Sequence, residues 1–135
     1  NKNDEIISKI KTKIKILIEN LKKLYPKHKG IQRLPYKIYL YEIPEKHKHK
    51  TAYVVNKKEI YICIDENKDL NELYFIVLHE LAHIITESVG HMNGFWINFR
   101  LILRLSIKLN LYKFKNYKRN PKYYCNKLIN NTPLI

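Results

Sequence analysis

Residues 70–86, LNELYFIVLHELAHIIT, decide the fold of this chain. Apolar side chains cover almost every face of the stretch, and its length favours a buried helix over a strand. Three polar residues, His79, Glu80 and His83, interrupt the apolar pattern. Such side chains are costly to bury unless something pairs with them. The stretch therefore predicts a central helix with a polar site on one face.

The H-E-x-x-H spacing of these residues predicts a zinc site. His79 and His83 are four residues apart, so they project from one helix face and their imidazoles can bind one Zn²⁺. Glu80 follows directly and can reach a water on the metal without being a ligand. The alternative is a pair of core histidines that are satisfied within the protein. We favour the metal because it supplies the partner that buried polar groups need.

A third zinc ligand is required, because catalytic zinc sites usually have three protein ligands and one open position. Glu87 would lie about 12 Å along a continuing helix from His79, at 1.5 Å per residue, which is too far to share one ion. Gly90 permits the chain to turn back, and His91 comes next. We therefore predict His91 as the third ligand, the alternative being a surface histidine in a loop.

The rest of the chain predicts an α+β protein with a single domain over residues 1–135, the length of one ordinary domain. Apolar residues recur with helical spacing near both ends of the chain, and short alternating runs between them are typical of strands. The predicted helices cover residues 4–25, 70–86 and 93–109, and the predicted strands cover 35–43, 51–55 and 60–64.

The composition predicts a basic protein that resides in a reducing compartment. Lys and Arg total 26 against 12 Asp and Glu, giving a formal charge of +14. A charge of this size is compatible with nucleic acid as a partner through non-specific phosphate contacts, since Lys outnumbers Arg, and equally with a merely basic surface. No uncharged apolar run approaches the roughly 18 residues of a membrane span, so we expect no membrane. Cys63 and Cys125 fit no disulfide framework, which predicts a reducing, intracellular compartment and only packing for Cys125.

The run HELAHIITESVGHMNGFW resembles the SprT-like and WLM-domain metallopeptidases of the zincin group. These proteins combine the H-E-x-x-H helix with a later Gly-His and an aromatic pair, here Phe95-Trp96. The resemblance covers residues 52–135 and is greatest to small WLM-like proteins of large DNA viruses. Those proteins share an N-F-R-like helix start, a Tyr-Cys and a Thr-Pro-Leu near the end. Two departures stand out: seven residues separate His83 from His91 where metzincins have five, and Asn126 replaces a Gly.

The resemblance implies a zincin-like domain in which an N-terminal helix packs on a small mixed or antiparallel sheet of about three strands. The H-E-x-x-H helix and a C-terminal helix follow. It further implies a zinc-dependent endopeptidase with one Zn²⁺ per chain and Glu80 as the general base. The protein or peptide substrate would lie along an exposed sheet edge at Ala52, Tyr53, Val54 and Val55. SprT-like and WLM relatives are associated with proteins crosslinked to DNA, which places this chain in the cytoplasm or nucleus, or in a virion.

Two other functions are compatible with the sequence. One is a basic nucleic-acid-binding protein with a vestigial enzyme site. The other is a structural or virion protein in which zinc only fastens the fold, with Cys125 or Glu87 as a fourth ligand. Phe95 and Trp96 could line a pocket, but aromatic residues at such helical positions are more often core, and we expect core.

Overall fold

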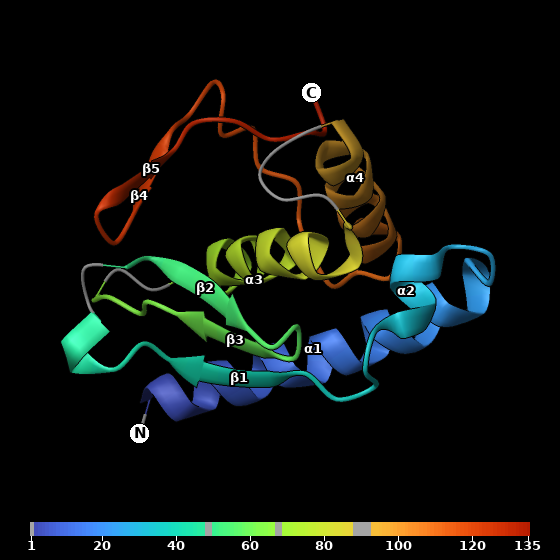
Figure 1. Cartoon of the computed structure of the whole chain (residues 1–135). Helices are drawn as coiled ribbons and strands as arrows, with labels where there is room; N and C mark the ends of the chain where they lie inside the picture. The colour runs from blue at the N-terminus through green and yellow to red at the C-terminus, as the bar shows by residue number, and fades with distance from the viewer. Residues whose placement is uncertain (1, 48–49, 67–68, 88–92) are drawn as a thin grey trace.

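The computed structural model describes residues 2–47, 50–66, 69–87 and 93–135 and shows a mixed α+β fold (Figure 1). This confirms the predicted class. The helices are α1 (Lys2–Leu24), α2 (Lys29–Arg33), α3 (Leu70–Ile85) and α4 (Asn93–Lys108), with a short 3-10 turn at Glu45–His47. The strands are β1 (Tyr39–Glu42), β2 (Ala52–Val55), β3 (Glu59–Ile62), β4 (Lys122–Tyr124) and β5 (Lys127–Ile129).

The first three strands form a mixed sheet in the order β1-β3-β2. β1 runs parallel to β3, with Leu40 opposite Ile60, and β2 runs antiparallel to β3, with Val54 opposite Ile60. The small mixed sheet expected from the sequence is therefore confirmed. β2 pairs with β3 on one side, and no other described strand pairs with it on the other, so β2 is an edge strand.

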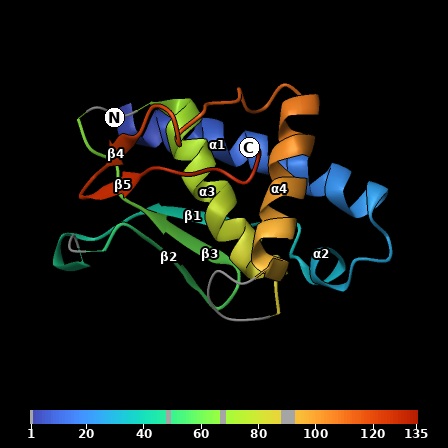
Figure 2. The same cartoon turned by 90° about the horizontal axis from the view of Figure 1, so that it is seen from above.

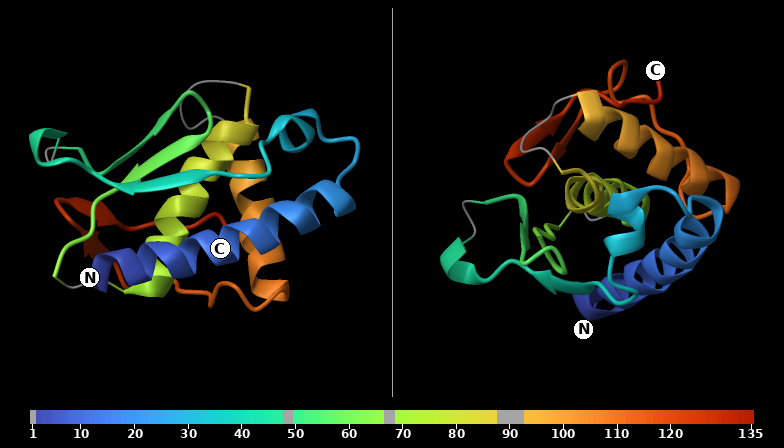
Figure 3. Two further views of the ribbon diagram at one scale, coloured as in Figure 1. Left: turned by 90° about the horizontal axis from the view of Figure 1, so that it is seen from below. Right: turned by 45° about the vertical axis from the view of Figure 1, so that its right-hand side comes forward.

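The core lies between this sheet and the helices, which cover one of its faces (Figures 1 and 3). α1 buries a stripe that includes Ile10, Leu17 and Leu21 and leaves most of its lysines exposed. α3 crosses the middle of the molecule between the sheet and α4 (Figure 2). Its apolar residues are buried on nearly all sides, which explains why its sequence shows little amphipathic periodicity. The helix at the centre of the fold is thus the one that carries His79, Glu80 and His83.

The short helix α2 is not among the helices that the sequence predicts. Gly30 is buried where α2 meets the end of α3, and a Cβ added there would collide with the carbonyl oxygen of Ile85. Only a residue without a side chain permits this approach. His28 caps α2 by accepting a hydrogen bond from the Ile31 N–H at 3.1 Å, and its Nε2 bonds Asn98 Oδ1 at 2.9 Å.

The cysteine prediction was wrong, because Cys63 and Cys125 form a disulfide. Cys63 follows β3, and Cys125 lies in the tight turn of the antiparallel hairpin β4–β5, with the Cα atoms 6.5 Å apart. The hairpin itself was not predicted, and without it nothing in the sequence brings two residues 62 positions apart together. The expectation of a reducing compartment loses its basis, and Cys125 does more than pack.

None of the described helices combines the length and the apolar character that crossing a bilayer demands.

The Gly30 contact generates a first prediction. Gly30→Ala should lower the free energy of unfolding by about 1–3 kcal/mol, because the added methyl must displace backbone at the end of α3. Gly94→Ala is the matched control, since a Cβ there meets only Thr86 Cγ2 at 3.9 Å. Urea unfolding of both variants measures the difference. Equal stability of the two variants would contradict the proposed close packing of α2 on α3.

Candidate functional site

The three motif residues lie on α3, and side chains cap this helix at both ends. Its first turn is capped by Asp69, whose side chain accepts from the Asn71 N–H at 2.9 Å. At its end, Thr86 Oγ1 donates to the Ala82 carbonyl at 2.6 Å. The ring centroids of His79 and His83 lie 4.9 Å apart on the same face, as the i, i+4 spacing predicts. The two imidazoles are therefore close enough to share one ion.

Aromatic side chains from α4 hold both imidazoles in place. Phe95 stacks on the His83 ring at 4.2 Å between centroids and meets His79 edge-on at 5.1 Å. Phe99 meets His79 edge-on at 5.4 Å. Phe95 is fully buried, so its predicted place in the core is confirmed. Packed rings of this kind restrict the rotamers of the histidines, which pre-organises a ligand pair.

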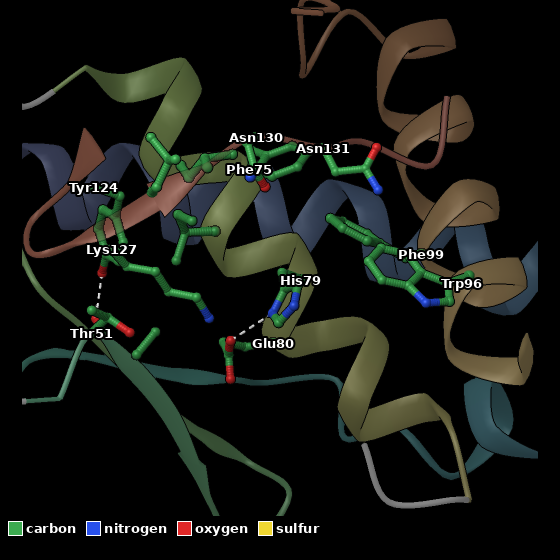
Figure 4. A pocket seen from close by; sticks show the side chains of 14 residues that line it. Thr51, Phe75, His79, Glu80, Trp96, Phe99, Tyr124, Lys127, Asn130 and Asn131 are labelled. Carbon is green, nitrogen blue, oxygen red and sulfur yellow. Dashed lines mark hydrogen bonds and ion pairs between the residues drawn. The ribbon is translucent and has the colours of Figure 1, made fainter. Parts of the chain in front are cut away.

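Glu80 is nearly buried, with 8% of its surface exposed, and lies beside His79. The His79 Nδ1–H donates to Glu80 Oε2 at 2.8 Å, as the dashed line in Figure 4 shows. When Nδ1 of a neutral imidazole carries the proton, Nε2 carries the lone pair that can bind a metal. The hydrogen bond thus satisfies one carboxylate oxygen and sets the ring in the tautomer that a ligand needs.

The third predicted ligand, His91, lies outside the described residues. Within the ranges that the structure describes, no group of three His, Cys, Asp or Glu side chains is placed to hold a metal ion. The two residues considered as closing ligands are engaged elsewhere. The exposed Glu87 carboxylate pairs with Arg33 at 3.0 Å, and the Cys125 sulfur belongs to the disulfide rather than being a thiolate.

A cleft of about 220 Å³ opens beside His79 and Glu80. Its walls come from the start of β2, from α3, from α4 and from the C-terminal hairpin with the residues after it (Figure 4). Of the residues predicted to bind substrate along the sheet edge, Ala52 lines the cleft together with Thr51. Tyr53 projects from the opposite face of the sheet, because neighbouring residues of a strand alternate between faces. Val54 and Val55 lie further along the β2 edge.

Several lining residues were missed by the sequence analysis. Lys127 extends from β5 with its ammonium directed toward Glu80, and Asn130 and Asn131 lie further along the same wall (Figure 4). Trp96 lines the cleft and also packs half-buried against the core, so both interpretations of this residue hold. No local pattern in the Lys- and Tyr-rich tail identified these residues, since only the folding of the hairpin onto α3 brings them to the site.

The hairpin wall is held in place by Tyr124 and by the disulfide. The Tyr124 hydroxyl accepts from the Cys63 N–H and donates to the Thr51 carbonyl, each at 2.6 Å. Burial raises the pKa of this hydroxyl above its ordinary value, so it stays protonated and keeps both bonds. The cleft wall is therefore tied to the ends of both β2 and β3.

An ion pair ties the hairpin to α3 as well. Lys122 Nζ lies 3.3 Å from Glu72 Oε2 and 3.8 Å from Asp69 Oδ2. Burial raises the pKa of the Glu72 carboxyl, and the neighbouring Lys122 opposes that shift. The start of α3 is thus fastened to β4 by a partly buried charge pair.

Known proteins similar to this chain are uncharacterized proteins of viruses. One, from Acanthamoeba polyphaga mimivirus, is 35% identical over 99 residues, which cover 69% of this chain and 50% of that protein. One from Invertebrate iridescent virus 6 is 34% identical, and the match covers 55% of this chain and 44% of that protein. One from Invertebrate iridescent virus 3 is 35% identical, and the match covers 55% of this chain and 48% of that protein. The chain spans about half the length of these relatives. No protein family and no solved structure matches it.

The disulfide generates a second prediction. Cys63→Ser should lower the free energy of unfolding by about 4 kcal/mol on the chain-entropy estimate, because the bridge closes a loop with a sequence separation of 62. Urea unfolding with and without reductant measures the change. Reductant should destabilise the wild-type protein and leave Cys63→Ser unaffected. Identical midpoints of the oxidised wild type and the variant would show that the bridge does not hold the hairpin.

Proposed function

We propose that this chain is a zinc-dependent endopeptidase with a zincin-like single domain, in keeping with its resemblance to the SprT-like and WLM metallopeptidases. One observation carries the proposal. His79 and the nearly buried Glu80 line a cleft that also includes the start of an edge strand, and the His83 ring lies 4.9 Å from the His79 ring on the same helix face. A purely structural role for these groups would not require a cleft beside them.

The donor set fits zinc. Imidazole nitrogen is a preferred zinc ligand, and the aromatic packing around His79 and His83 keeps their rings on one side of α3. Together with His91 they would hold one ion per chain. When bound, Zn²⁺ polarises a carbonyl group and lowers the pKa of a water toward 7. The structural-zinc alternative is weakened by the disulfide, which removes Cys125 as a fourth thiolate ligand.

Glu80 would act as the general base. One of its oxygens is oriented by the His79 Nδ1–H, and the residue lines the cleft. Its carboxylate takes a proton from the attacking water and then delivers that proton to the amine nitrogen of the departing peptide. The low exposure of Glu80 excludes much of the bulk water that would otherwise compete for the proton.

The substrate would bind as an extended peptide against the free edge of β2. Backbone hydrogen bonds along an edge strand give affinity without reading many side chains, so a loose sequence preference follows. Lys127, Asn130 and Asn131 on the opposite wall offer donors for substrate carbonyl or carboxylate groups. The family resemblance suggests proteins bound or crosslinked to DNA as substrates. The viral relatives suggest an infected cell or a virion as the place of action.

Glu80→Gln tests the mechanism. Cleavage of an unfolded protein substrate by the zinc-loaded enzyme should fall by about 10²–10⁴-fold, because the amide cannot accept the proton, while bound zinc stays unchanged. Glu87→Gln is the matched control, because the exposed Glu87 pairs only with Arg33 among the contacts described and should leave activity intact. Full cleavage by Glu80→Gln would remove Glu80 from the mechanism and favour a vestigial site.

Metal analysis tests the ligand set. The wild-type protein should hold about one zinc per chain, and His79→Ala, His83→Ala and His91→Ala should each lose most of it, because three ligands are needed for a catalytic zinc. His47→Ala, in the turn before β2, is the control and should retain the metal. Retention of zinc by His91→Ala would overturn the assignment of the third ligand.

A further inference from the structure

The face of the sheet that points away from the helices carries a row of tyrosines. In the register of the sheet, Tyr41 of β1 and Tyr53 of β2 both lie opposite Tyr61 of β3, and Tyr39 precedes Tyr41 by two residues. Paired residues project to the same face, so all four share one side, while their neighbours Leu40 and Ile60 point into the core. We call this surface, defined by Tyr39, Tyr41, Tyr53 and Tyr61, the tyrosine face.

The rings of the tyrosine face are in contact with one another across all three strands. Centroid distances are 6.4 Å from Tyr39 to Tyr41, 5.2 Å from Tyr41 to Tyr61 and 4.8 Å from Tyr61 to Tyr53. The two tyrosines of β1 are exposed, at 38% for Tyr39 and 40% for Tyr41, and Tyr53 and Tyr61 are half-buried. None of the described α-helices covers this side of the sheet (Figure 3), and the His47 ring of the 3-10 turn meets only the Tyr53 end of the row, edge-on at 6.3 Å. A continuous, partly exposed aromatic surface of this kind is typical of an interaction site.

Lysines flank the row at both ends. Lys37 Nζ lies 5.1 Å from the centroid of Tyr39, and Lys50 Nζ lies 4.9 Å from the centroid of Tyr53. The chain as a whole carries a formal charge of +14, so the long-range field also attracts anions. One carboxylate, Glu59, lies on the same face, where it accepts a hydrogen bond from the Tyr61 hydroxyl at 3.0 Å. The surface is thus aromatic in the middle and cationic at its ends.

We propose that the tyrosine face binds single-stranded nucleic acid. Unpaired bases stack on tyrosine rings, and the phosphates that connect them meet Lys37 and Lys50, whose ammonium groups move from the ring faces to the backbone. A duplex keeps its base faces stacked internally and would reach only the lysines. Stacking does not read the sugar, so DNA and RNA strands share this chemistry. The proposal does not depend on the metal site, because none of these residues lines the cleft.

Fluorescence anisotropy with labelled oligonucleotides tests the proposal. The probes are oligo-dT and oligo-U of about twelve nucleotides, within the range of single-strand site sizes, and a duplex of equal length. We expect the wild-type protein to bind the single strands more tightly than the duplex at about 50 mM salt, and the affinity to fall at about 200 mM. The ratio of the DNA and RNA affinities identifies the natural strand, and either ratio supports the proposal.

Variants of the face then separate stacking from charge. Tyr41→Leu and Tyr53→Leu should each weaken single-strand binding about fivefold or more, whereas Tyr41→Phe and Tyr53→Phe keep the ring and should bind like the wild type. Lys50→Met should reduce the slope of log affinity against log salt by about 0.7, the value for one phosphate contact. Glu59→Gln should strengthen binding by removing a like charge. Tyr123→Leu, on β4 and 71% exposed, is the matched control and should have no effect.

Three results would overturn the proposal. They are the absence of single-strand binding at low salt, a duplex that binds as tightly as the single strands, and leucine variants that bind like Tyr123→Leu. In the last two cases the lysines of α1 or another basic surface would account for binding. Circular dichroism and urea unfolding of each variant establish that it is folded, and the phenylalanine variants keep the test valid if a leucine variant unfolds.

Discussion

The need to satisfy polar side chains within an apolar helix governs the centre of this molecule. α3 is buried on nearly every side, yet it carries Glu80 and two imidazoles. The structure meets part of that need with the hydrogen bond between His79 and Glu80 and with the rings of Phe95 and Phe99. Buried polar groups are costly unless they are paired, and the proposed zinc ion would complete the pairing of these side chains.

The cleft depends on how the C-terminal hairpin is attached. A two-stranded hairpin is only marginally stable alone, and here three different interactions hold it. The disulfide joins its turn to the end of β3, the Tyr124 hydroxyl bridges the backbone of both neighbouring strands, and Lys122 pairs with Glu72. Because these attachments surround the cleft wall, the volume beside Glu80 is a built feature rather than a gap left by a loose tail.

The small sheet contributes to two separate surfaces, the cleft and the tyrosine face. The edge of β2 borders the cleft, while the same strand directs Tyr53 to the tyrosine face on the far side. The alternation of side chains along a strand allows this division without any additional structure. A substrate at the edge and a nucleic acid on the face could therefore be held by one sheet simultaneously. Such an arrangement would place proteins that are attached to nucleic acid close to the cleft.

Much of this architecture follows from local spacing. The period of apolar residues predicted two of the helices, and the apolar run with its H-E-x-x-H motif predicted the third, each within two residues of its observed ends. The H-E-x-x-H spacing also predicted that His79 and His83 share a face. Both depend on the geometry of a single helix, which nearby residues determine. Strand positions were also predicted, although the run over residues 35–43 was longer than β1, because Pro35 and Ile38 flank the strand without pairing in it.

Local patterns of this kind did not predict the contacts between distant segments. The pairing of Cys63 with Cys125, the approach of Gly30 to Ile85 and the entry of Lys127 into the cleft beside Glu80 join parts of the chain that are separated by 62, 55 and 47 positions. These contacts contribute to the free energy of folding only after the helices and the sheet have packed and brought those segments together. Residue type and spacing carry no record of that packing, so the wall of the cleft was a property of the folded molecule alone.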